Sequence, residues 1–124
     1  MIARFEFRVA PQAPPNARLY HLIGVLDSSK AVERLAVELR NETARHLILD
    51  FQQVTYVNST GFGILVELVI ELRDGGKEVY IIDPHPRVKV VFEQLGGDEL
   101  PIYRAPDAIA KITAASLVPP PPPK

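Results

Sequence analysis

The sequence of 124 residues contains no cysteine and no tryptophan, and it has only three histidines. The absence of cysteine excludes disulfide bonds, thiolate metal sites and cysteine catalysis. His21, His46 and His85 belong to separate predicted elements and lack the spacing of metal ligands, so we expect no metal centre and no cofactor. No apolar run approaches the roughly 20 residues that a membrane-spanning helix needs, and we expect no membrane insertion.

The sequence also lacks an excess of charge of either sign. Its formal net charge is −1, and no cluster of lysine and arginine favours binding to nucleic acid or to an anionic membrane. A hydrophobic content of 47% and a charged content of 23% are typical of a water-soluble domain with a single core. Residues 1–8 alternate in hydropathy and carry charge, unlike a secretory signal, so we expect a cytoplasmic location.

The hydrophobic pattern predicts strands that alternate with helices. Strands are expected near residues 5–9, 18–26, 47–49, 78–82 and 100–104, and helices near 30–41, 60–74, 86–95 and 106–114. The first two strands should form a hairpin, and the rest should be joined by helical crossovers. This order predicts an α/β fold with a mixed, mostly parallel β-sheet and about four helices packed mainly on one side.

The prediction for domain organisation is one domain at residues 1–115, followed by a proline-rich tail at 116–124. Five successive prolines end the chain before Lys124. Such a run adopts the extended polyproline II conformation and cannot build a core. Two interpretations remain open for it: a disordered terminus, and a ligand for an aromatic groove.

The segment from Asp50 to Leu65 carries the most specific signal in the chain. The apolar run 47–49 ends at Asp50, a short polar crossing is expected, and Ser59, Thr60 and Gly61 then stand at the start of a long helical pattern. A helix N-terminus presents backbone N–H groups without helical partners and favours negative charge. A hydroxyl group there can cap the helix or accept a phosphate, and the residues alone leave both roles open for Ser59.

The same helix predicts a surface for a partner. Its core face should contain the apolar side chains Ile64, Leu65, Leu68 and Leu72. A second apolar stripe, formed by Phe62, Val66 and Ile70, is left pointing away from that core. Because a helix that covers a sheet needs only one apolar face, this stripe is interpreted as an exposed contact surface. The alternative is that the helix after Pro86 covers Phe62 and Val66.

The same residues do not favour other functions. Asp50 at a strand end suggests a receiver domain, but the acids expected after the first strand and the lysine near the last strand are missing. No G-x-S-x-G turn surrounds Ser59, which argues against a hydrolase that would use His85 as its base. The glycines make no nucleotide-binding fingerprint.

The residues Asn58-Ser59-Thr60-Gly61 resemble the signature of the STAS domain found in bacterial anti-sigma factor antagonists. The resemblance extends from about Leu19 to Ile112 and differs at Asn58, where members usually have aspartate. It implies the STAS fold and a noncatalytic role in binding an anti-sigma factor with serine kinase activity.

By the same resemblance, Ser59 is the phosphoacceptor, and Phe62, Val66 and Val88 contact the partner. Phosphorylation of Ser59 would end the complex and so switch the antagonist off. A homodimer is a further possibility. Asn58 favours an alternative, in which the chain is an unphosphorylated structural STAS subunit of a signalling scaffold or a transporter complex.

Overall fold

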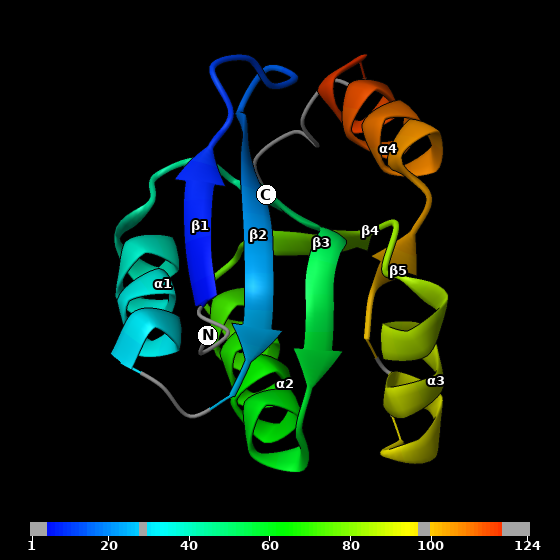
Figure 1. The fold of residues 1–124 in the computed structure, drawn as a ribbon. Helices are drawn as coiled ribbons and strands as arrows, with labels where there is room; N and C mark the ends of the chain where they lie inside the picture. Colours follow the sequence, from blue (N-terminus) through cyan, green and yellow to red (C-terminus); the bar gives the residue numbers. More distant parts are fainter. Residues whose placement is uncertain (1–4, 28–29, 97–99, 118–124) are drawn as a thin grey trace.

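The computed structural model describes residues 5–27, 30–96 and 100–117, and Figure 1 shows their arrangement. The strands and helices are β1 (Phe5–Val9), β2 (Ala17–Leu26), α1 (Lys30–Asn41), β3 (His46–Val57), α2 (Ser59–Asp74), β4 (Glu78–Ile82), α3 (Pro86–Gln94), β5 (Ile102–Tyr103) and α4 (Ala105–Leu117). The predicted order of elements is therefore confirmed. The five prolines near the C-terminus lie outside the described residues, so the proposed tail stays a prediction.

The five strands form one mixed sheet in the order β1-β2-β3-β4-β5. β1 and β2 are an antiparallel hairpin in which Phe7 lies opposite Leu22. The three other neighbouring pairs are parallel, and α1, α2 and α3 supply the crossovers that parallel strands require. The predicted class, α/β with a mixed and mostly parallel sheet, is confirmed.

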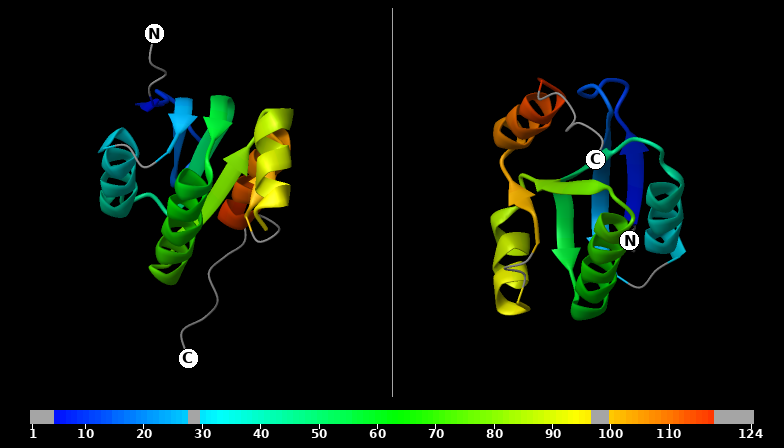
Figure 2. Two further views of the ribbon diagram at one scale, coloured as in Figure 1. Left: turned by 60° about the horizontal axis from the view of Figure 1, so that its bottom comes forward. Right: turned by 180° about the vertical axis from the view of Figure 1, so that it is seen from behind.

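Alternate residues of β3 point to opposite faces of the sheet and contribute to two cores. Leu47 and Leu49 belong to the larger core, which α1, α2 and α3 cover, whereas Ile48 belongs to the smaller core beneath α4. Helix α2 lies behind the strands in Figure 1 and in front of them in the right-hand view of Figure 2. Three of the four described helices thus share one face, as the sequence predicted.

The smaller core has a buried histidine at its margin. Nδ1 of His46 lies 3.0 Å from the hydroxyl oxygen of Tyr80, and the two rings are 5.8 Å apart. Burial lowers the pKa of His46, and the positive charge of Arg45 lowers it further. The imidazole is therefore held in its neutral form near neutral pH.

β3 is longer than the strand that was predicted from the apolar run 47–49. The segment after Asp50, which was expected to be a polar crossing, forms the second half of this strand. Beyond Asp50 the strand pairs only with β2, and its buried residues recur every third position, at Phe51, Val54 and Val57. Two register shifts against β2 each insert one extra residue into β3. Because of these bulges, the buried residues in the second half of β3 are three positions apart and do not alternate. The sequence pattern of a regular strand is therefore missing there.

Candidate functional site

Helix α2 is capped by Asn58. Its backbone is extended (φ −95°, ψ 173°), and its side-chain oxygen Oδ1 accepts a hydrogen bond of 2.7 Å from the backbone N–H of Gly61. The backbone N–H of Phe62 donates to the carbonyl oxygen of Asn58 at 2.9 Å, closing the first helical turn. The capping role that remained open for Ser59 therefore belongs to the residue before it.

Ser59 and Thr60 occupy the first two helical positions, and both are exposed. Since Asn58 supplies the cap, the Ser59 hydroxyl is not engaged in capping and is directed to the surface. It lies in the first turn of a helix of 16 residues, where the backbone favours negative charge. The expected placement of Ser59 at a helix N-terminus is confirmed, while its chemistry remains a prediction.

Gly61 is needed for close packing against the end of β2. A Cβ atom at this position would lie 2.2 Å from the carbonyl oxygen of Leu26 and 2.8 Å from the backbone nitrogen of Asp27. The backbone N–H of Asn58 also donates to the Leu26 carbonyl oxygen at 3.3 Å. The glycine of the motif therefore holds the start of α2 against the neighbouring loop, whatever the role of the hydroxyls beside it.

Phe62 is buried, and the prediction that it forms an exposed contact is wrong. Its side chain is 8% exposed, and its ring lies 5.7 Å from that of Phe92 in α3. Phe92 in turn lies 5.8 Å from the ring of Phe51 in β3. Helix α3 thus covers Phe62, which is the alternative that the sequence left open.

Val88 also differs from the predicted contact surface, whereas Val66 does not. Val88 is 1% exposed in the larger core and cannot meet a partner, so its assignment as a partner contact is wrong. Val66 is half-buried and packs at the margin of the same core. Val88 is buried because α3 packs against β3, whereas Val66 is only partly covered and stays a predicted contact.

A narrower surface remains on α2, which we call the Ser59 stripe. At 100° per residue, Ser59, Gly63, Val66 and Ile70 fall within one arc of the helix. Ser59 and Gly63 are exposed, Val66 is half-buried, and the Ile70 side chain is 51% exposed. This stripe joins a hydroxyl at the helix N-terminus to an apolar strip, and sequence analysis missed Gly63 as a member.

The C-terminal end of the Ser59 stripe borders a small cavity. A cavity of about 60 Å³ lies between α2 and the segment after α3, lined by Val66, Val69, Ile70, Arg73, Gly96 and Leu100. Its volume suits the insertion of an apolar side chain and not a small-molecule ligand.

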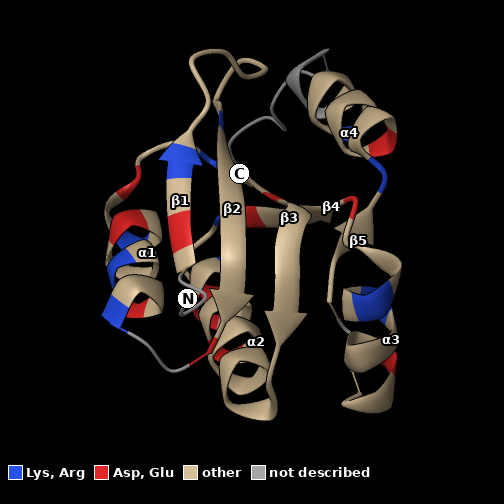
Figure 3. Ribbon diagram, viewed as in Figure 1, with Lys and Arg blue, Asp and Glu red and all other residues tan. Residues whose placement is uncertain are grey.

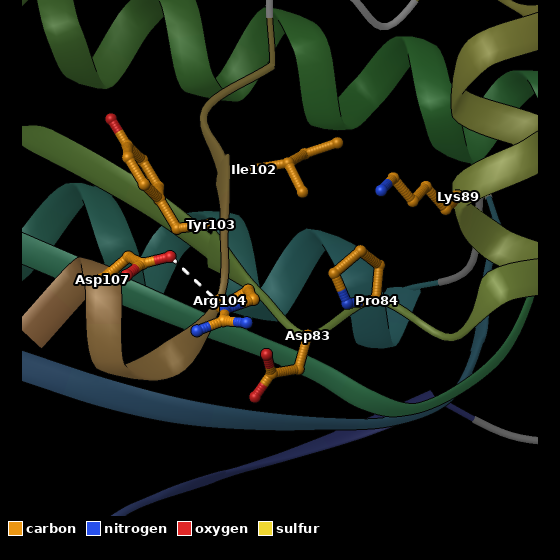
Figure 4. Close-up of a pocket in the computed structure, with 7 residues that line it drawn as sticks. All are labelled: Asp83, Pro84, Lys89, Ile102, Tyr103, Arg104 and Asp107. Carbon is orange, nitrogen blue, oxygen red and sulfur yellow. Dashed lines mark ion pairs between the residues drawn. The ribbon is translucent and has the colours of Figure 1, made fainter.

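A second pocket lies beside the edge strand β5 (Figure 4). It has a volume of about 380 Å³ and is lined by Asp83, Pro84, Lys89, Ile102, Tyr103, Arg104 and Asp107. Arg104 pairs with Asp107 at 3.4 Å, and Oδ1 of Asp83 accepts from the backbone N–H of Ala105 at 3.2 Å. Because two acidic and two basic side chains line this pocket, its electrostatic potential has no dominant sign.

The remaining candidates have structural roles. Asp50 lies inside β3 and not at its end. Its Oδ1 accepts a hydrogen bond from the backbone N–H of Gln52, and its Oδ2 lies 2.8 Å from Nδ1 of His21. His85 caps α3 by accepting from the backbone N–H of Arg87 at 3.2 Å. Across the described ranges, no three histidine or acidic side chains gather as metal ligands, and no helix is long and apolar enough to cross a membrane.

Comparison with known proteins identifies the family. The STAS domain profile matches residues 8–109, and the chain belongs to the STAS domain family. A curated relative, an anti-sigma-B factor antagonist of Staphylococcus aureus, is 29% identical over 69 residues, which are 56% of this chain. The match spans 64% of that relative's length.

Solved structures show the same fold. The anti-sigma factor antagonist SpoIIAA in its unphosphorylated form superposes with a TM-score of 0.67 at 21% identity, covering 91% of this chain and 99% of its own. A sulfate transporter family protein from Wolinella succinogenes gives a TM-score of 0.73 at 18% identity, covering 86% and 93%. SpoIIAA of Bacillus, which also matches in its phosphorylated form, gives 0.63 at 21% identity, covering 86% and 98%.

Proposed function

We propose that this chain is an anti-sigma factor antagonist that binds an anti-sigma factor through the Ser59 stripe. One observation carries the proposal: the hydroxyl group of Ser59 is exposed at the N-terminal end of an apolar strip. This hydroxyl does not cap the helix, because Asn58 does. The Staphylococcus aureus relative supports the class of partner. The role is binding and not catalysis. Because sigma factors act on transcription, the proposal also locates the chain in the cytoplasm.

The switch that we propose is phosphorylation of Ser59 by the anti-sigma factor itself. A phosphate adds about −1.5 to −2 charges at neutral pH. In the free protein the N-terminus of α2 accommodates this charge, because backbone N–H groups and the helix dipole favour it there. In a complex the phosphate would be pressed beside the apolar strip, and a penalty of about 3 kcal/mol would weaken binding roughly a hundredfold.

Intact-mass measurement after incubation with the cognate anti-sigma factor and ATP tests the phosphorylation. Wild type and Thr60→Ala should each gain one phosphate, and Ser59→Ala should gain none. Ser59→Asp should bind the anti-sigma factor much more weakly than wild type, whereas Ser59→Ala should bind normally. A phosphate that persists in Ser59→Ala would refute Ser59 as the acceptor.

A second candidate function is a binding module without a switch, such as a STAS subunit of a scaffold or of a transporter complex. Asn58 favours it, because the carboxylate usual in the family motif is missing. The fold of the Wolinella succinogenes transporter family protein is compatible with it. Wild type that gains no mass, combined with Asn58→Asp that does, would establish this second function and exclude the switch.

A further inference from the structure

Strand β1 is an open edge of the sheet. It pairs with β2 on one side, and within the described part of the chain no strand lies on its other side. Figure 3 shows one acidic and one basic band on this strand, which are Glu6 and Arg8. Edge strands with unpaired backbone groups are the places where sheets extend into other chains.

The backbone of β1 shows which of its groups face outward. The N–H of Ala10 donates to the carbonyl oxygen of Leu19 at 2.8 Å, in the same register as the strand pairing. Residues that bond to the neighbouring strand alternate along an antiparallel ladder, so the even-numbered residues of β1 are those that bond to β2. The N–H and C=O groups of Phe5, Phe7 and Val9 therefore point away from the sheet.

These outward groups can pair with the same strand of a second copy in one favourable register. With Phe7 opposite Phe7 of the second copy, Phe5 meets Val9 and each Glu6 lies opposite an Arg8. A shift of two residues in either direction places Glu6 against Glu6 or Arg8 against Arg8, which is unfavourable for directly opposed side chains. β1 is thus self-complementary in sequence, backbone polarity and charge.

We propose that the protein forms a two-fold dimer in which β1 of each copy pairs antiparallel in this register. A groove of about 580 Å³ between β1 and α1 supports the proposal, and its lining residues are Phe7, Lys30, Glu33, Arg34, Val37 and Glu38. In the proposed dimer, the strand added to the edge lies beside this groove. The added strand's Phe7 points to the same face as the first and covers Val37, which is 53% exposed.

Charge reversal tests the register. Glu6→Arg and Arg8→Glu each place like charges opposite one another in a homodimer, so each should weaken dimerisation by about tenfold or more. An equimolar mixture of the two variants should recover the wild-type affinity, because each strand of the mixed dimer then faces opposite charges. The double variant Glu6→Arg/Arg8→Glu should also dimerise like wild type. Sedimentation equilibrium measures all four samples.

Val9→Pro tests the backbone pairing. It removes an N–H that faces outward and not a bond to β2, and prolines are tolerated on the solvent side of edge strands. We expect a folded monomer with an unchanged circular dichroism spectrum. Wild type that stays monomeric up to about 1 mM would overturn the proposal. Glu6 and Arg8 would then be charged residues that prevent the edge strand from pairing with other chains. A dimer that Val9→Pro and both single reversals leave intact would overturn it equally.

Discussion

Truncation of Phe62 tests whether this side chain stabilises the fold or contacts a partner. The Phe62 ring is 8% exposed and contacts Phe92, which bridges α2 and α3 to β3 through Phe51. Phe62→Ala removes a buried ring whose surroundings are held by three separate elements, so the cavity cannot close fully. We expect a loss of about 3–5 kcal/mol in the free energy of unfolding. For a domain of this size, the melting temperature should fall by roughly 10–20 °C.

Ile70→Ala is the matched control for this prediction, because it truncates an apolar side chain on the exposed arc of the same helix. Its 51% exposure predicts a change in the free energy of unfolding within about 0.5 kcal/mol. Urea denaturation followed by circular dichroism at the helical minimum measures both variants, which suits a chain without tryptophan. If Ile70→Ala were the destabilising variant and Phe62→Ala the neutral one, the orientation of α2 about its axis, with Phe62 facing the core and Ile70 facing solvent, would be wrong.

Three further predictions concern the motif and the smaller core. Asn58→Ala should lower the free energy of unfolding by about 1 kcal/mol, whereas Ser59→Ala should change it little, and equal losses in urea denaturation would contradict the capping assignment. Gly61→Ala should be strongly destabilising because its Cβ meets backbone atoms, whereas Gly63→Ala, with no atom within 4 Å of the new Cβ, should gain about 0.5–1 kcal/mol. The lowered pKa of His46 means that the unfolded chain binds a proton more readily than the folded one, so stability should fall as pH drops below about 6.5; the urea midpoint of His46→Gln should depend less on pH there.

The sequence was sufficient for the order of elements because each pattern depends on local spacing. Val32, Leu35, Ala36 and Leu39 recur at helical intervals and are the buried residues of α1. The second half of β3 escaped detection because its bulges replace alternation with a period of three. No local rule places two bulges, since they depend on how β2 and β3 align.

The error at Phe62 has a different physical origin. Helical periodicity gives the angle of a side chain around its own axis, but it does not give the position of the next helix. Phe62 lies beside the Ser59 stripe on the α2 surface, and only the approach of Phe92 decides that it is covered. Capping was undecided for a simpler reason, because Asn58, Ser59 and Thr60 can each cap a helix and stand in succession.

At the start of α2, the residues that make structural contacts are not the residues that carry exposed hydroxyl groups. Asn58 and Gly61 turn inward, where one caps the helix and the other permits contact with Leu26. Ser59 and Thr60 turn outward and have no part in those contacts. Aspartate at position 58 would offer the same capping oxygen while adding a negative charge beside Ser59. Exchange between Asn and Asp at this position can therefore change the charge beside Ser59, and with it the phosphate transfer that we propose, while leaving the cap, the glycine contact and the apolar strip in place.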